Sequence, residues 1–429
     1  MPFLLLLQVA DRQLPPPSFW VFFGFTALKL LVVFTVYMVG VALLTLAERK
    51  ISAWIQDRHG PNRVGWHGIA QPLADGLKNL MKEESTPGMV NKPLFNLAPI
   101  LSFIPALVTW AVIPFGAPWP TRWGRIDMVL ADLPVGFLYT LAIASLGVYG
   151  IVLAGWASNN KYALLGGLRS SAQMISYEIA MGMSTIPVLL LAGNVTMNEI
   201  VMQQQAGLWN VLTLTIAFFI FMVAAFAETN RLPFDLPEAE SELIAGYHSE
   251  YSAMKFSFFF IAEYANMVTA SALMVTLFFG GWDIPGGWDA PPWTALKSMA
   301  TILFFALKVL FFVFFFMWIR WTLPRFRYDQ LMSLGWKFML PLALGYIVVI
   351  AGAQLAMQRF GIVPGWRQGL VLLGLNAVLV ILIFVLLDRG RLLSPASAPA
   401  RDDRLRRLRE RSRRSTLRRP DVLTPETGD

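Results

Sequence analysis

Long apolar segments set the class of fold that this chain can adopt. Nine of them, each of about 20 residues, follow one another along the 429-residue chain. A helix of roughly 20 apolar residues crosses the hydrocarbon core of a bilayer and satisfies its own backbone hydrogen bonds. The sequence therefore predicts an all-α polytopic membrane protein, a helical bundle of about nine transmembrane helices with an amphipathic surface helix after the first. The predicted spans are 19–46, 95–115, 134–156, 172–192, 210–228, 254–280, 297–320, 336–357 and 367–387.

The composition excludes the soluble classes of protein. Only 14% of the residues are charged, whereas a soluble domain has about 25%, because a surface in water needs charge. Cysteine is absent, which excludes iron–sulfur ligation by this chain, thiolate zinc sites and disulfides. The three histidines show no metal spacing, and there is no nucleophile elbow, Walker loop or dinucleotide fingerprint. We therefore assign no catalytic residue, redox centre or metal site to this chain.

Lysine and arginine are distributed unequally between the two sides of the predicted bundle. One side carries 24 of them and the other side 4, or 12 and 4 without the C-terminal tail. The rich side comprises the loops 47–94, 157–171, 229–253 and 321–335 and the tail 388–429. Positive charge marks cytoplasmic loops, so we expect the N-terminus outside and the C-terminus in the cytoplasm. The twelve arginines of the tail favour a membrane surface over nucleic acid, and we expect the tail to be disordered.

The first long loop contains a segment with two unlike faces. On a helical projection, one face has Ile69, Leu73, Leu77 and Leu80, and the other has Asp75, Lys78 and Lys82. This pattern predicts an amphipathic helix at the membrane surface. Two interpretations remain open: a simple surface anchor, or a helix whose polar face closes the entrance of a cavity.

The loop after the fifth span is unusually acidic. It reads AETNRLPFDLPEAESELIAGYHSEYS from the end of that span, and Arg231 is its one basic residue. Its acids are Glu228, Asp235, Glu238, Glu240, Glu242 and Glu250. Clustered carboxylates raise one another's proton affinity, and in a crevice they can pass protons. The alternation with apolar residues favours that interpretation over a solvated acidic loop.

Ionisable residues lie well inside several predicted spans: Lys29, Glu178, Glu263 and Lys308, with Glu228 at a span end. Such residues are costly at membrane depth and mark functional sites by default. Glu178 and Glu263 have polar neighbours in the sequence, which favours a proton path over a structural role beside a buried base. Lys29 and Lys308 either extend to the interface or pair with a glutamate.

Several long motifs resemble one known family. They include AERKISAWIQDRHGPNRVG, QPLADGLKNLMKEE, AGWASNNKYALLGGLRSSAQMISYE, PFDLPEAESELIAGYHSEYS and PRFRYDQLMSLGWKFMLP. Together they are similar to the H-subunit family of the bacterial proton-pumping NADH–quinone oxidoreductase, respiratory complex I. The resemblance covers about residues 19–357 in unbroken order and implies a core of eight spans.

The resemblance also implies a site and its partners. Cytoplasmic loops would form most of a quinone chamber, entered from the lipid beneath a terminal cluster on a neighbouring subunit. Around the chamber it places Arg49, Arg58, Asp75, Arg169, Arg231 and Asp235. On a glutamate chain toward the antiporter-like subunits it places Glu178, Glu228 and Glu263, with Glu238, Glu240, Glu242 and Glu250 where the chain begins.

Quinone would then be a substrate, whereas NADH, FMN and the iron–sulfur clusters would belong to partner subunits. The implied partners are the cluster-bearing and quinone-site hydrophilic subunits, the small membrane subunits and membrane lipid, with no nucleic acid. The implied location is the bacterial inner membrane.

Two features depart from the resemblance. The segment 358–387, with the ninth span, and the tail 388–429 extend beyond the eight-span core, as the outer segment 1–18 precedes it. The third span has no acidic residue, so a relay that uses a carboxylate there in relatives must use water or another helix here.

Two other functions compete with this interpretation. The membrane subunit of an energy-converting hydrogenase has a related architecture but needs no quinone chamber. A stand-alone ion transporter is the second alternative, although inverted repeats and matching broken helices are not evident.

Overall fold

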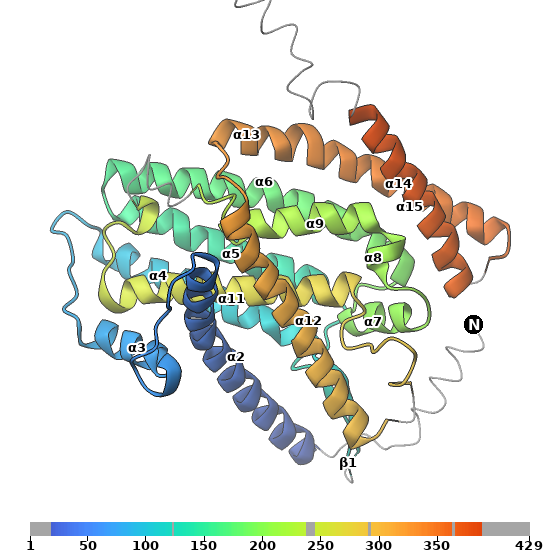
Figure 1. Cartoon of the computed structure of the whole chain (residues 1–429), viewed down its shortest axis with the longest axis horizontal. Coiled ribbons are helices and arrows are strands. Elements are labelled where there is room, and N and C mark those ends of the chain that lie inside the picture. Colours follow the sequence, from blue (N-terminus) through green and yellow to red (C-terminus); the bar gives the residue numbers. More distant parts are fainter. Residues whose placement is uncertain (1–18, 122–123, 237–244, 291–292, 363–364, 388–429) are drawn as a thin grey trace, which may run out of the picture. The chain divides into compact units, whose positions relative to one another are not determined.

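The computed structural model describes residues 19–121, 124–236, 245–290, 293–362 and 365–387. Each predicted span has a helical counterpart (Figure 1). These helices are α2 (Phe19–Ile55), α4 (Lys92–Val108), α5 (Gly136–Ala157), α6 (Lys161–Ala192), α9 (Thr215–Glu228), α11 (Ala253–Phe278), α12 (Ala295–Thr322), α14 (Leu340–Arg359) and α15 (Trp366–Leu387). Within the described residues, 8 helices are long and apolar enough to cross a membrane. The all-α class of a multi-pass membrane protein is confirmed.

Shorter helical elements connect or extend the spans. They are η1 (Trp66–Gly68), α3 (Gln71–Met81), η2 (Thr109–Val112), α7 (Met197–Gln205), α8 (Asn210–Thr213), η3 (Gly246–His248), α13 (Tyr328–Ser333) and the π-helical η4 (Leu334–Met339). The helix α3 lies where the amphipathic pattern predicts one. Its apolar face, with Leu73, Leu77 and Leu80, is exposed, as expected for a helix that rests on lipid.

A small hairpin was not predicted from the sequence. The strands β1 (Gly116–Thr121) and β2 (Gly124–Met128) pair antiparallel in a loop rich in proline and tryptophan, with an irregularity after Gly116. The paired residues are Gly116 with Met128, Trp119 with Ile126, Pro120 with Arg125 and Thr121 with Gly124. This hairpin belongs to the loop between α4 and α5.

The fifth span is broken. Leu214 has φ −132° and ψ 45°, which separates α8 from α9. The 14 residues of α9 rise about 21 Å, less than the roughly 30 Å of a hydrocarbon core. The single predicted span 210–228 is therefore two helices, and α9 ends at Glu228.

The helix α6 begins earlier than its apolar run. Residues 157–171 were expected to form a loop, but α6 starts at Lys161. The Asn160 side chain caps it by accepting from the backbone N–H of Tyr162 at 2.9 Å, which satisfies one of the free donors of the first turn. Hydropathy detects only apolar turns, so the polar first turns were missed. Arg169 therefore lies on a helix.

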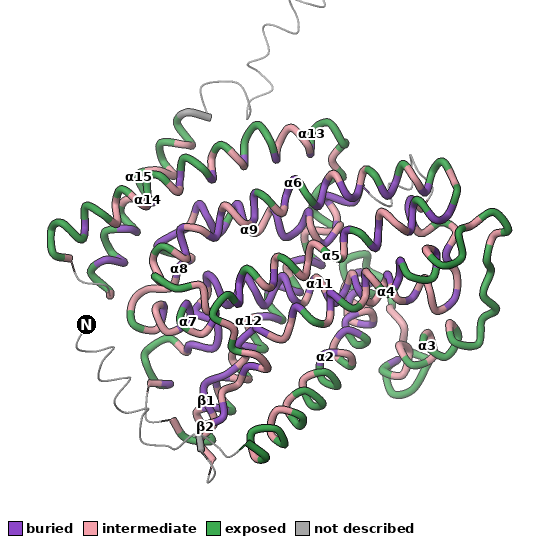
Figure 2. Tube along the Cα trace, turned by 180° about the vertical axis from the view of Figure 1, so that it is seen from behind, coloured by how far each residue is buried: buried purple, intermediate pink, exposed green. Residues whose placement is uncertain are grey.

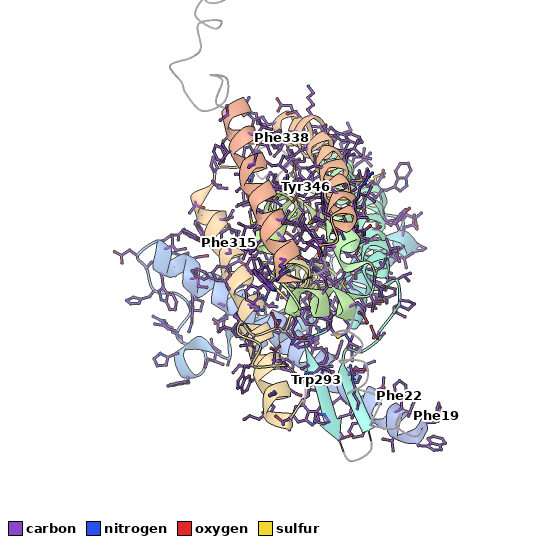
Figure 3. The ribbon with its side chains drawn as sticks, turned by 90° about the vertical axis from the view of Figure 1, so that its right-hand side faces the viewer. Phe19, Phe22, Trp293, Phe315, Phe338 and Tyr346 are labelled. Carbon is purple, nitrogen blue, oxygen red and sulfur yellow. The ribbon has the colours of Figure 1, made fainter. Side chains whose placement is uncertain are left out.

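Burial is concentrated in the middle of the bundle (Figure 2). Of the spanning windows, that of α11 is the most buried, at 67%, whereas that of α2 is 22% buried. The side chains of Phe19 and Phe22, on the first turn of α2, are 70% and 57% exposed and project outward (Figure 3). An apolar surface of this kind is expected to face lipid.

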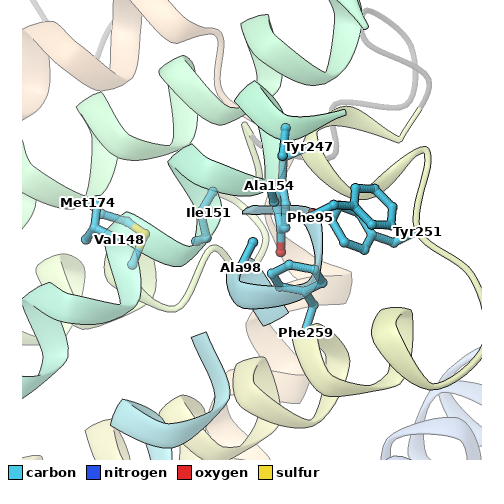
Figure 4. Packing of buried hydrophobic residues seen from close by; sticks show 10 residues of the cluster. Phe95, Ala98, Val148, Ile151, Ala154, Met174, Tyr247, Tyr251 and Phe259 are labelled. Atoms are coloured by element: carbon cyan, nitrogen blue, oxygen red, sulfur yellow. The ribbon is translucent and has the colours of Figure 1, made fainter. Parts of the chain in front are cut away.

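An aromatic cluster anchors the acidic loop to the bundle (Figure 4). Tyr247 and Tyr251 follow the acidic segment and pack on Phe95 of α4 and Phe259 of α11. The rings of Phe95 and Tyr251 stack with centroids 4.0 Å apart. This packing sets the position at which the loop re-enters the bundle.

The chain divides into two units, one up to Leu373 and one from Gly374. The described part of the second unit is the continuation of α15 to Leu387. Its Val378, Ile381 and Phe384 are exposed.

Small residues let α5 and α6 approach closely. A Cβ atom on Gly155 would lie 2.6 Å from the backbone oxygen of Ala163 and 3.3 Å from the Cα atom of Gly167. Close approach at small residues is a usual way for membrane helices to pack, because lipid supplies no hydrophobic drive between them.

We predict that Gly155→Ala destabilises the bundle by about 1–3 kcal/mol, because the added methyl group forces α5 away from α6. The matched control is Gly345→Ala on α14, where nothing lies within 4 Å of the added atom. The measurement is the midpoint temperature of unfolding in detergent. Equal midpoints for the two variants would contradict the close packing.

Candidate functional site: a buried ionic network beside a carboxylate cavity

The four lysine- and arginine-rich loops contact one another. Backbone and side-chain hydrogen bonds join them in pairs: Ser85 N to Ser252 Oγ at 2.9 Å, Asn91 N to Ala157 O at 3.2 Å, Asn160 Nδ2 to Glu250 Oε1 at 2.6 Å, and Phe326 N to Pro233 O at 3.2 Å. These segments are therefore at one end of the bundle, as the charge count predicts for loops on one side of a membrane.

A buried glutamate on α2 holds two arginines. Glu48 is 4% exposed. The Nη1 atom of Arg231, in the turn after α9, donates to both carboxylate oxygens, at 2.9 and 3.0 Å. Arg320, near the end of α12, binds the same carboxylate. Charges taken out of water must be paired, so these contacts tie the ends of three helical segments together.

Arg231 also binds α11. Its Nε atom lies 2.7 Å from Glu263 Oε1, and its guanidinium carbon lies 4.4 Å from the ring centroid of Tyr264. Burial lowers the pKa of Arg231, but the carboxylates of Glu263 and Glu48 outweigh it and hold the pKa above its ordinary value. The two arginines and two glutamates have balanced charges, so we regard the network as fixed in its charged form.

A second ion pair closes the turn that contains Arg231. Asp235, 5% exposed, accepts from Arg325 Nη2 at 2.9 Å. On the other side of the turn, the side-chain amide of Gln173 on α6 donates to the backbone carbonyls of Ala227 and Phe234, at 2.7 and 2.6 Å. The turn is thus held from α6 and from the segment before α13.

A cavity of about 40 Å³ lies next to the network. Three carboxylates line it: Glu228, Asp235 and Glu263. The other polar residues of its wall are Ser102, Thr229, Asn230, Tyr247 and Asn266. A buried water needs about 10–15 Å³ of such space and two to four polar partners, so the cavity can hold about three waters between the acids.

Glu178 continues the line of acids beyond the cavity. It lies on α6, within electrostatic reach of Glu228. Ser145, on the third span, donates to Glu178 Oε1 at 2.5 Å. The third span, which has no acid, therefore supplies a hydroxyl to this carboxylate.

Three predicted chamber residues, Arg49, Asp75 and Arg58, lie outside the buried network. Arg49 and Asp75 pair at 2.6 Å between α2 and α3, with side chains 47% and 24% exposed. Burial raises the pKa of Asp75, but the hydrogen bond and charge of Arg49 outweigh it, so the pKa lies below its ordinary value. Arg58 is exposed and donates to Gln56 at 2.6 Å.

The remaining predicted residues are dispersed. Arg169 lies over the ring of Tyr328, 5.9 Å from its centroid, and Glu250 accepts from Asn160. Glu238, Glu240 and Glu242 lie outside the described residues.

Within the described residues, both membrane lysines donate to backbone carbonyls, and neither forms an ion pair with a glutamate. Lys29 donates to the backbone carbonyls of Asp127 and Val129, at 3.0 and 2.8 Å. Lys308 donates to the backbone carbonyls of Phe279, Gly281 and Asp283, at 2.7, 3.0 and 2.8 Å. Both lysines hold connections at the end of the bundle opposite the ionic network.

Sequence reasoning missed Glu48, Tyr264, Arg320 and Arg325 as site residues. For the three charged residues, the available signal was a charge near the end of an apolar run, on the side rich in arginine. That signal is weak because such positions are usually solvated. Among the described residues, no group of histidines and carboxylates is arranged to hold a metal ion.

Residues 28–351 match the sequence profile of a family described as NADH dehydrogenase. The chain belongs to this family. It is 51% identical over 351 residues to the H subunit of the NADH-quinone oxidoreductase of Leptospira biflexa, which covers 80% of this chain and 96% of that relative. It is also 51% identical over 322 residues to an H subunit of the same enzyme from Geobacter metallireducens, with 75% and 94% covered. Over 333 residues it is 51% identical to the NADH-ubiquinone oxidoreductase chain 1 of Chondrus crispus, with 77% and 97% covered. The family match ends before α15.

We predict that Glu48→Gln destabilises the protein by about 3–5 kcal/mol, because it leaves Arg320 and the buried Arg231 with a single carboxylate, that of Glu263. Asp75→Asn is the matched control and should cost about 0–1 kcal/mol, since its ion pair is partly solvated. Thermal unfolding in detergent measures both. If Glu48→Gln is no more destabilising than Asp75→Asn, the network does not hold the helices together.

Proposed function

We propose that this chain is the membrane-embedded H subunit of a proton-translocating NADH–quinone oxidoreductase, forming most of its quinone chamber and a glutamate-lined coupling path. One structural observation supports the detailed part of the proposal, the quinone chamber and the coupling path. A charge-balanced network built on Arg231 adjoins a cavity whose wall includes Glu228 and Glu263. The relatives, at about half identity, are named as subunits of NADH–quinone or NADH–ubiquinone oxidoreductases.

The quinone chamber is proposed to lie at the end where the loops meet. Arg231 and Asp235 hold the buried turn there, and their ion pairs give it a rigid polar wall. Arg49 and Asp75 join α2 to the surface helix α3, whose exposed leucines suit the lipid interface. A quinone has an apolar tail and two carbonyl acceptors, so a lipid-side entrance and a polar interior fit its chemistry. Arg58 and Arg169 are proposed at the margin of this chamber.

The coupling path is proposed to begin with the acids of the loop after α9, namely Glu238, Glu240, Glu242 and Glu250. It continues through the cavity acids Glu263 and Glu228 to Glu178. The cavity volume and the Ser145 hydroxyl support water-linked transfer between these groups. Among the described residues, no cation forms an ion pair with Glu228 or Glu178, which is costly for a carboxylate in a membrane, so a change in protonation best explains these two acids.

The assembly around the chain belongs to the same proposal. NADH, FMN and the iron–sulfur clusters are assigned to partner subunits, and quinone is a substrate. Hydrophilic subunits meet the loop end, and small membrane subunits and lipid meet the spans. We place the protein in the bacterial inner membrane, with the N-terminus outside and the C-terminus in the cytoplasm.

The division of the chain is also proposed. The core is 19–357, and the segment 358–387 and the tail 388–429 are additions. The match to residues 28–351 supports that division. The hydrogenase and transporter alternatives have lost support, because the relatives carry quinone oxidoreductase names.

The first prediction concerns the chamber. Asp235→Asn should lower quinone reduction at least about tenfold, because a buried hydrogen bond to a charged group contributes roughly 1.5–3 kcal/mol. NADH oxidation by a soluble artificial acceptor should stay unchanged, since the redox centres are on other subunits. The control is Glu83→Gln, an exposed acid after α3. Normal quinone kinetics in assembled Asp235→Asn complex would remove this residue from the chamber.

The second prediction concerns the coupling path. Glu178→Gln and Glu228→Gln keep the shape and hydrogen bonding of the side chain but cannot release a proton. Both should sharply lower protons pumped, and coupled quinone reduction should fall with it, whereas Glu→Asp should retain part of the activity. Glu199→Gln, on α7 at the other end, is the control. Rates of pumping and of quinone reduction in proteoliposomes that both match the parent would make these acids structural.

A further inference from the structure

Two aspartates are buried in the connection between α11 and α12, at the end of the bundle opposite the ionic network. Asp283 is 6% exposed and Asp289 is 0% exposed. Neither belongs to the proposed quinone chamber or to the glutamate path. Burial of two acids in one connection is costly unless cations or protons compensate them.

Neutral groups hold one oxygen of each carboxyl. Asp283 Oδ2 accepts from the indole N–H of Trp209, before α8, at 2.7 Å. Asp289 Oδ2 accepts from the backbone N–H of Ile284 at 3.3 Å. The other oxygen, Oδ1 of Asp289, is buried and forms no hydrogen bond of normal geometry within the described residues. The side chain of Gln205, at the end of α7, faces Asp289.

The two carboxyl groups are neighbours in the connection, because Asp289 accepts from the backbone N–H of Ile284, the residue that follows Asp283, and the charge of Asp289 acts on Asp283. Ionised carboxylates are acceptors only, so there is no donor between them while both Asp283 and Asp289 are charged. One proton supplies that donor and removes the repulsion, as in other carboxyl pairs held close together. The unsatisfied Oδ1 atom is then the acceptor or the carrier of the proton.

One cation faces the pair from α12. The Nζ atom of Lys308 binds three carbonyls of the connection and lies 4.2 Å from the ring centroid of Trp209. Lys297, also on α12, donates to the Ala290 carbonyl at 2.8 Å. The side chains that face the two carboxyls from α7 and from the residue before α8, those of Gln205 and Trp209, are uncharged. Of the two lysines, Lys308 is the one whose charge acts on both carboxyl groups, so full ionisation of the pair would set two buried carboxylates against it.

We propose that Asp283 and Asp289 bind one proton between them, and that this proton latches the α11–α12 connection onto α7 and α8. The ligand is the proton itself. The site is distinct from the glutamate path, and under the proposed topology it faces the side to which protons are pumped.

The direction of the pH dependence follows from the folded state. Burial, together with the charge of Asp289, raises the pKa of Asp283 to about 6, although the Trp209 hydrogen bond opposes this. Burial likewise raises the pKa of Asp289. A raised pKa means that the folded connection binds the proton more tightly than the unfolded one. Its stability is greatest in acid and is lost as pH rises through about 6. The latch is therefore closed in acid and loosened in base.

The test is amide hydrogen exchange of residues 279–290 in the purified assembled protein, between about pH 5 and pH 8, corrected for intrinsic rates. We expect protection to fall severalfold with a midpoint near 6. Asp283→Asn should keep the connection protected at both ends of the range, because the amide is neutral and still accepts from Trp209. The control Asp127→Asn, at the same end and 43% exposed, should keep the parental pH dependence.

Infrared spectroscopy gives a measurement on the parent itself. A protonated carboxyl C=O stretch that titrates with the exchange midpoint, and is missing from Asp283→Asn, supports the shared proton. Exchange that does not vary with pH in the parent overturns the proposal, as does an Asp283→Asn variant that keeps the full pH dependence. If the variant does not fold, absence of a titrating carboxyl band in the parent overturns it.

Discussion

The site depends on one buried cation. Arg231 lies between Glu48 and Glu263, which come from α2 and α11, with the ring of Tyr264 against its guanidinium. Each ion costs several kcal/mol to remove from water, so the helices cannot separate without leaving a charge unpaired. Apolar packing cannot supply this specificity, because lipid is as apolar as the side chains that face it. Electrostatic pairing thus determines which helix ends meet.

The balance of charge separates fixed acids from those able to titrate. Glu263 faces the cavity but lies against Arg231, and the network is already neutral. Among the described residues, no cation forms an ion pair with Glu228 or Glu178, and the latter is held by the Ser145 hydroxyl. A change of protonation at Glu228 or Glu178 therefore disturbs the charge balance of the site less than a change at Glu263. Glu263 would serve the path mainly by its contact with the cavity.

The sequence predicted the parts of this arrangement that depend on local pattern. The spans, the surface helix and the acids inside apolar runs follow from hydropathy, because a charge in such a run is conspicuous. The contacts between charged residues that are far apart in the sequence do not follow from local pattern. Glu48 and Arg320 lie at the ends of apolar runs, where charges are common, and they are 272 residues apart. The polar first turns of α6 and the break at Leu214 were also missed, since hydropathy does not detect caps or backbone breaks.

The interior of α11 decides the direction that a proton can take. Glu263 lies in the first half of this helix and Asp283 lies beyond its end, and no acidic or basic side chain comes between them. The hydroxyls of Ser271 and Thr276 donate to carbonyls of their own helix at 2.8 Å, so they do not form a relay along it. A proton on the proposed path would therefore move sideways, through the cavity that Glu263 and Glu228 both line. The proposed coupling path would then run across the bundle between helices, and it would be separate from the proposed proton site of the two aspartates at the far end.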